Sequence, residues 1–219
     1  MSDAAPLGLN FRRVQEHFCA IESSSLSSSE AAYQHRLREA LALCDVALRQ
    51  VVQLDVFSKN EVLDDVNTGD MKLLLLGFYR GEMLLRLVDV PPDHAKRLKI
   101  LEQALAALRG FLGDLERLEA LPKSAKESWD AADADTMDAG TMRQLKITRM
   151  KASRAAQQRM AVLAKQMKSP EQDDDTDDLE REHIMLMIET CCHTALDSIR
   201  SSEQELDMLQ QAIRMMALM

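Results

Sequence analysis

The chain has 219 residues and a formal net charge of -9 at pH 7, with a pI near 5.1. This acidic balance argues against general nucleic-acid binding, which requires a dominant positive field. Aromatic residues make up only 4% of the chain, with seven glycines and five prolines, while hydrophobic residues reach 46%. Such a composition favours an all-α protein with a buried core over barrels, sandwiches and Rossmann sheets, which need β-branched runs.

Secreted and membrane-spanning classes are also disfavoured. Residues 1–10 lack the basic start and apolar stretch of a signal peptide. The most apolar run, residues 71–88, is interrupted by Lys72, Arg80, Glu82 and Arg86, so it indicates a buried helix and no membrane contact. The four cysteines lack disulfide-framework spacing, and we expect a reduced cytoplasmic protein, with the nucleus as the alternative.

Two helices and a serine-rich loop are predicted at the start of the chain. Apolar residues recur three and four positions apart in residues 9–22, which is typical of a helix. Ser27 and Glu30 have capping-box spacing, so a long helix is predicted from there to about Leu54.

The next segment contains a second capping-box pair, Ser58 and Glu61, which predicts a short helix through Val66. Residues 67–70 are predicted to form a turn and a helix N-cap. Residues 71–88 are apolar nearly all round, so this helix should lie centrally among the others.

The second half of the chain alternates long helices with acidic segments. Helices are predicted at about 93–121, from about Arg143 to Met167, and at 179–219, where the pattern allows a break near Ser201. The polar, acidic stretches at about 122–139 and 169–178 are predicted as flexible loops.

These elements predict one domain over residues 1–219, built as an antiparallel array of about seven helices. The architecture expected is a helical repeat of the TPR type or a 14-3-3-like array.

Signatures of catalysis are missing from the sequence. It has no phosphate-binding loop, no dinucleotide fingerprint, no H-E-x-x-H and no G-x-S-x-G. Cys191, Cys192 and His193 are neighbours that diverge around a helix, and the acidic run 173–178 lacks the glycine and final glutamate of an EF-hand. We therefore expect no enzyme activity, no cofactor and no metal; an enzyme with a divergent site is the alternative.

Residues 143–168 contain no acid, although the chain is acidic. On a helical wheel, one side is apolar and should face the core: Met142, Leu145, Ala152, Ala156, Met160, Leu163 and Met167. The other side is mostly basic: Arg143, Lys146, Lys151, Arg154, Lys165 and Lys168. Ile147 and Met150 lie among these cations, whereas Arg149 points into the apolar side and should pair with an internal carboxylate.

Apolar side chains within a basic face are what a protein-binding surface needs, because charge steers the partner and apolar contact holds it. The candidate partner-binding residues are Arg143, Lys146, Ile147, Met150, Lys151 and Arg154. The alternative is a solvated face, or one that pairs with the acidic linker; spacing alone leaves both open. The cations from Arg159 onward fit the second description better.

Four segments carry a family resemblance in chain order. They are residues 60–65 (NEVLDD) with Thr68 and 71–74 (MKLL); Arg97-Leu98 with Leu101, Ala104, Phe111-Leu112 and Leu115-Glu116; residues 143–151 (RQLKITRMK); and residues 180–182 (ERE) leading into Ile188, Ala195, Ile199, Glu203 and Leu206. Together, over about residues 60–209, they resemble the type 2A phosphatase-associated proteins, the Tap/alpha-four regulators. The third segment is the most specific, similar to R-x-x-K-I-x-R-Y/F-K, with Met150 at the aromatic position.

The resemblance implies a non-catalytic regulator that binds and stabilises catalytic subunits of type 2A-like Ser/Thr phosphatases in TOR signalling. It implies that Arg143 and Lys146 contact the phosphatase, with weaker direct roles for Arg149 and Lys151. The first 59 residues match poorly, and the comparison of motifs leads us to expect a chain without the family's C-terminal tail. We expect a monomer when unbound; a general helical adaptor for another acidic protein or peptide is the alternative.

Overall fold

The computed structural model describes residues 5–58, 60–132, 139–167 and 176–217, and these residues form helices and no strands. Seven helices have ten or more residues, which confirms the predicted all-α fold. They are α1 (Leu7–Glu22), α2 (Ala31–Gln53), α4 (Leu75–Leu85), α5 (His94–Arg117), α6 (Lys123–Ala132), α7 (Ala139–Gln166) and α8 (Thr176–Ala217). Three short elements lie between α2 and α4: η1 (Leu63–Asp65), α3 (Thr68–Met71) and η2 (Lys72–Leu74).

Contacts between residues group the chain into two compact units. Unit 1 comprises residues 1–60, 73–113 and 198–219, and unit 2 comprises residues 61–72 and 114–197. The single domain expected from the sequence stays a prediction, and each unit is described by itself.

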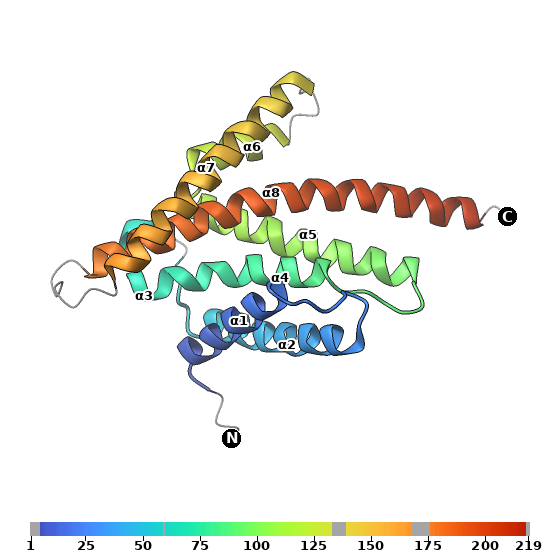
Figure 1. Ribbon diagram of the computed structural model, residues 1–219, viewed down its shortest axis with the longest axis horizontal. Helices are drawn as coiled ribbons and strands as arrows, with labels where there is room; N and C mark the ends of the chain where they lie inside the picture. The colour runs from blue at the N-terminus through green and yellow to red at the C-terminus, as the bar shows by residue number, and fades with distance from the viewer. Residues whose placement is uncertain (1–4, 59, 133–138, 168–175, 218–219) are drawn as a thin grey trace. The chain divides into compact units, whose positions relative to one another are not determined.

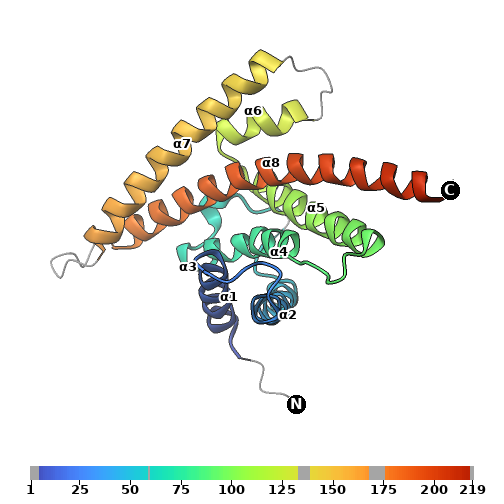
Figure 2. The same ribbon diagram turned by 45° about the vertical axis from the view of Figure 1, so that its right-hand side comes forward.

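Helix α4 is the centre of unit 1, as its all-round apolar sequence predicts. It packs against α1 and α2 on one side and against α5 on the other (Figures 1 and 2). Five rings from these elements form one cluster, with centroid separations from 4.6 to 6.3 Å. The rings belong to Phe11, Phe18, Phe78, Tyr79 and Phe111. Burial of these side chains contributes to the hydrophobic stabilisation of the unit.

The approach of α4 to α5 depends on Gly81. A Cβ atom built at Gly81 would lie 2.5 Å from Cγ of Leu108, which is fully buried. We expect Gly81→Ala to lower the free energy of unfolding by about 1–3 kcal/mol, because overpacking forces strained rotamers or helix displacement. Gly110 on α5 has no atom within 4 Å of such a Cβ, so Gly110→Ala should stabilise the protein by about 0.5–1 kcal/mol. Urea titration of both variants checks this; equal effects would contradict it.

Several predicted helix boundaries are wrong. Helix α2 begins at Ala31, after Glu30, and only half of the predicted capping box forms, since the backbone N–H of Ser27 donates to Glu30 Oε1 at 2.6 Å. The short helix expected through Val66 is one 3-10 turn, η1. The N-cap in residues 67–70 is confirmed, because Asn67 Oδ1 accepts from the Asp70 backbone at 3.1 Å.

The predicted central helix 71–88 is shorter than expected and ends at Leu85. Arg97 holds the end of the helix and the chain just after it, because it donates to the backbone oxygens of Leu85 and Leu87 at 3.0 and 3.2 Å. Arg97 also makes two hydrogen bonds to the carboxylate of Glu205, at 2.6 and 2.9 Å. Arg97, which belongs to the second family-like segment, thus stabilises the fold of unit 1.

Three further predictions for the second half of the chain differ from the structure. The loop expected at 122–139 contains helix α6 over Lys123–Ala132, and its remaining residues 133–138 lie outside the described residues. The loop expected at 169–178 lies mostly outside them too, but Thr176 already begins α8. Helix α8 continues for 42 residues without a break at Ser201, since Ser202 is buried.

Across the described residues, every helix is too short or too polar to cross a membrane.

Candidate functional site

Helix α7 of unit 2 carries the acid-free sequence. Its buried positions, Arg149, Ala156 and Leu163, follow one another at heptad intervals and mark the side that packs inward. Ala152, Met160 and Met167 are half-buried on the same side, in agreement with the wheel. The side chains of Met142 and Leu145, also expected in the core, lie outside the described residues.

All six candidate partner-binding residues are exposed. Ile147 and Met150 keep 37% and 49% of their surface accessible, although both are large and apolar. Around them lie the exposed cations Arg143, Lys146, Lys151 and Arg154, and no ion pair joins these four to another described residue. The structure therefore presents an apolar pair within a positive field, the combination that the sequence predicted.

Arg149 anchors the opposite side of α7. Its side chain is 10% exposed, and Nη2 donates to Oδ1 of Asp197 on α8 at 2.9 Å. The predicted ion pair is confirmed, but its carboxylate is not internal, because the Asp197 side chain is 53% exposed. The buried Nε of Arg149 has no hydrogen-bond partner among the described residues.

A second group of polar side chains lies on the same face of α8. The buried His193 places Nε2 3.3 Å from the Ser124 hydroxyl of α6 and 3.7 Å from a carboxylate oxygen of Glu189. Its Nδ1 has no partner in the described part of the chain. The arrangement is unlike a nucleophilic triad, in which an acid holds one ring nitrogen while the other faces the hydroxyl.

The stability of unit 2 should depend on the charge of His193. Burial lowers the pKa of its imidazole below 6.5; Arg149 acts in the same direction, while Glu189 and Asp197 oppose it. The folded protein therefore binds this proton less readily than the unfolded chain, and the stability contributed by the neutral imidazole falls as pH drops below about 6.5. We expect the difference in unfolding free energy between wild type and His193→Gln to shrink between pH 7.5 and 5.5. Urea titrations measure it, with His35→Gln as the exposed-imidazole control; a difference that grows contradicts the prediction.

The later part of α7 pairs with α8. Arg159 makes two hydrogen bonds of 2.7 Å to the carboxylate of Glu182, and this guanidinium lowers the pKa of Glu182. Arg159 thus pairs with an acid of α8 beyond the acidic stretch expected at 169–178, most of which lies outside the described residues. This arginine is therefore less available to a partner than Arg143 or Lys146.

The fourth family-like segment also has a structural role. Arg181 on α8 donates to the backbone oxygens of Leu63 and Val66, at 2.7 and 2.8 Å. The Thr68 hydroxyl donates to Asp177 at 3.0 Å, next to this contact. Sequence reasoning identified Leu63, Thr68 and Arg181 only as motif positions, because one sequence carries no signal for a side chain that binds backbone a hundred residues away.

The neighbouring Cys191, Cys192 and His193 are turned to different surroundings. Cys192 and His193 are buried, Cys191 is half-buried, and burial raises the pKa of the Cys192 thiol. Within the described ranges, no three His, Cys, Asp or Glu side chains are grouped so as to hold a metal ion.

The family assignment follows from a comparison with family models. The model of the TAP42-like family matches residues 7–218. The chain belongs to the TAP42-like family. This confirms the resemblance of the four segments, and it extends the match to residues 7–59, which the sequence motifs left out.

Curated relatives and a solved structure agree with this family. The protein named PP2A regulatory subunit TAP46 of Oryza sativa is 31% identical over 62% of this chain and 31% of its own length. The human protein named immunoglobulin-binding protein 1 family member C is 24% identical over 86% of this chain and 57% of its own. The chain thus spans less than two thirds of the length of either relative. The structure of the Tap42 alpha4 subunit matches with a TM-score of 0.78, covering 95% of this chain and 100% of that one; at 21% identity it shows the fold.

Proposed function

We propose that this TAP42-like protein is a non-catalytic regulator that binds the catalytic subunit of type 2A-like Ser/Thr phosphatases. The observation that carries the proposal is the exposed basic face of α7, with Ile147 and Met150 at its centre. Relatives in rice, tobacco and Arabidopsis are named PP2A regulatory subunits, which supports a phosphatase as the partner.

The chemistry of the face fits an acidic partner surface. Arg143 and Lys146 lie one helical turn apart near the start of α7, so both can meet the same cluster of carboxylates. Ile147 and Met150 supply the apolar contact that is desolvated on docking, while Lys151 and Arg154 extend the positive field. The remaining parts of the proposal are stabilisation of the catalytic subunit within TOR signalling, a cytoplasmic location and a monomeric unbound state.

Calorimetric titration of purified type 2A catalytic subunit into the full chain tests the proposal directly. We expect a saturable complex with one copy of each protein, and slower thermal inactivation of the bound catalytic subunit. Absence of binding, together with a phosphatase-free set of proteins co-purifying from the native cell, would favour the general adaptor instead.

A further inference from the structure

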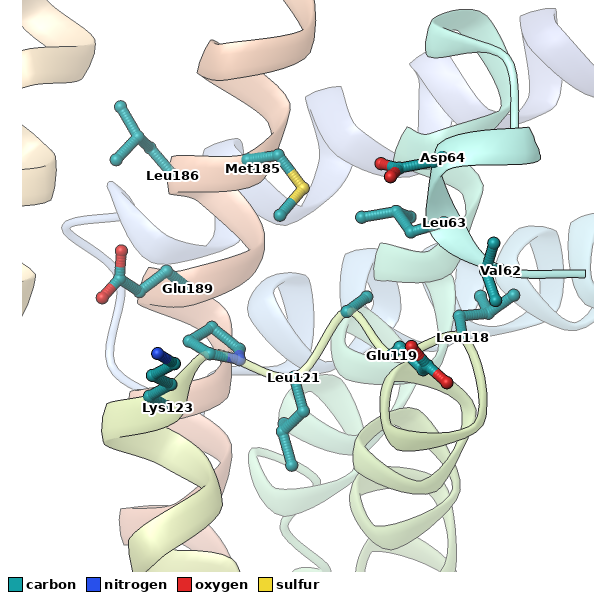
Figure 3. Close-up of a pocket in the computed structure, with 12 residues that line it drawn as sticks. Val62, Leu63, Asp64, Leu118, Glu119, Leu121, Lys123, Met185, Leu186 and Glu189 are labelled. Atoms are coloured by element: carbon teal, nitrogen blue, oxygen red, sulfur yellow. The ribbon is translucent and has the colours of Figure 1, made fainter.

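Unit 2 contains a pocket of about 490 Å³ beside the first family-like segment (Figure 3). This volume is within the range of pockets that hold ligands or side chains of a partner. Its walls come from three stretches of chain: residues 62–64 at η1, residues 118–123 between α5 and α6, and one face of α8. The α8 residues are Met185, Leu186 and Glu189.

The η1 wall is fixed by backbone hydrogen bonds. The N–H of Leu63 donates to the carbonyl of Leu118 at 2.9 Å, and Arg181 holds the carbonyl of Leu63 at 2.7 Å. The Leu63 side chain is nearly buried, whereas 37% of the neighbouring Val62 stays exposed. The pocket wall is thus held in place without a ligand, which lowers the entropic cost of binding.

The second wall depends on an unusual turn at the end of α5. Ala120 N–H donates to the Leu115 carbonyl at 2.8 Å, and Glu119 N–H to the Glu116 carbonyl at 3.0 Å, a Schellman pattern. Glu119 takes the left-handed position with φ of 56°, where glycine is the usual residue. The turn therefore places the carboxylate of Glu119 at the pocket, at a backbone position where glycine would be favoured.

The chemistry of the lining is apolar with an acidic excess. Figure 3 shows the side chains of Leu63 and Met185 across the pocket from one another, with the carboxylate of Asp64 beside them. Three carboxylates line the pocket, those of Asp64, Glu119 and Glu189, against the single amine of Lys123. Arg181 lies 4.0 Å from Asp64, but its guanidinium already donates to two backbone oxygens.

We infer that this pocket binds a peptide segment of a partner protein that places a bulky apolar side chain between Leu63 and Met185 and its adjacent Lys or Arg beside Asp64 and Glu119. The negative rim selects a basic peptide, whereas the basic face of α7 selects an acidic surface. The two surfaces of unit 2 therefore recognise partners of opposite charge, and the pocket does not depend on the phosphatase contact.

The probe is a synthetic peptide, Gly-Lys-Arg-Leu-Arg-Lys-Gly, titrated into the full chain labelled with 13C-methyl methionine. We expect the Met185 methyl resonance to shift saturably, and to stay in place with matched peptides in which Ser replaces Leu or Glu replaces every Lys and Arg. The Met185→Leu variant assigns the resonance. A resonance that is unmoved at about 1 mM of the basic peptide, or moved equally by the acidic one, overturns the inference.

Two variants separate binding from folding. Glu119→Gly should raise Tm, because glycine relieves the left-handed backbone, and yet weaken the peptide about two- to fivefold, as loss of a surface ion pair does. Asp64→Lys changes a side chain that is 99% exposed and should weaken the peptide at least as much with Tm unchanged. Asp207→Lys, an exposed acid of unit 1, is the matched control. Equal affinities for wild type and both pocket variants count against the site.

Discussion

The double charge reversal Arg143→Glu/Lys146→Glu should weaken binding of the type 2A catalytic subunit by about 100-fold or more. Both side chains are exposed on α7, so the substitution leaves the buried Arg149 side of the helix untouched. Replacing attraction by like-charge repulsion at a docked interface costs several kcal/mol, and about 2.7 kcal/mol corresponds to 100-fold. Calorimetry or surface plasmon resonance measures the loss.

The matched control is Lys126→Glu/Lys165→Glu, which changes the net charge equally at exposed cations of α6 and α7. It should reduce the association rate modestly and leave the dissociation rate unchanged, because distant charges only steer the encounter. A higher salt concentration should reduce the difference in affinity between wild type and the control, because it screens distant charges. The difference in affinity between wild type and Arg143→Glu/Lys146→Glu should fall less. A folded double variant that binds like wild type would remove α7 from the interface.

The helices could be predicted where apolar periodicity is strong, and they were missed where tertiary contact decides. Helix α6 has a polar sequence, but Ala125 is fully buried and the Trp129 indole donates to Glu116 at 3.3 Å. Packing within unit 2 thus stabilises ten residues whose local sequence favours a loop. Tertiary packing also overrides local sequence preference at Ser202, which is buried within α8 although the sequence there predicts the start of a new helix.

The exposed face of α7 could be predicted because it depends only on the helical period, which fixes the side of each residue. The residues that pair with the buried side of α7 could not be predicted. Asp197 lies 48 residues after Arg149, and their pairing depends on the register between α7 and α8, which a single sequence does not encode. The pocket beside η1 escaped prediction for the same reason, since Leu63, Leu118 and Met185 meet only in the folded unit.

The pair of Arg149 and Asp197 should respond unequally to loss of either partner. Asp197→Ala leaves a guanidinium that is 10% exposed without this carboxylate, and we expect a loss of about 2–3 kcal/mol in unfolding free energy. Arg149→Met leaves a carboxylate that is 53% exposed to solvent, and it removes the buried Nε that has no partner among the described residues. Its stability should stay within about 1 kcal/mol of wild type, because an apolar side chain of similar length fills the site.

The double variant Arg149→Met/Asp197→Ala completes a double-mutant cycle with the two single variants. Its stability should lie close to that of Arg149→Met alone, since the loss in Asp197→Ala comes from the stranded charge and disappears with it. Urea unfolding of all four proteins measures the coupling. Equal losses in the two single variants would contradict the asymmetry and would mean that Asp197 matters through contacts other than Arg149. Asp197→Ala should also bind the catalytic subunit more weakly than Arg149→Met does. The unpaired charge of Arg149 destabilises the inner side of α7 and therefore the face that carries Ile147 and Met150.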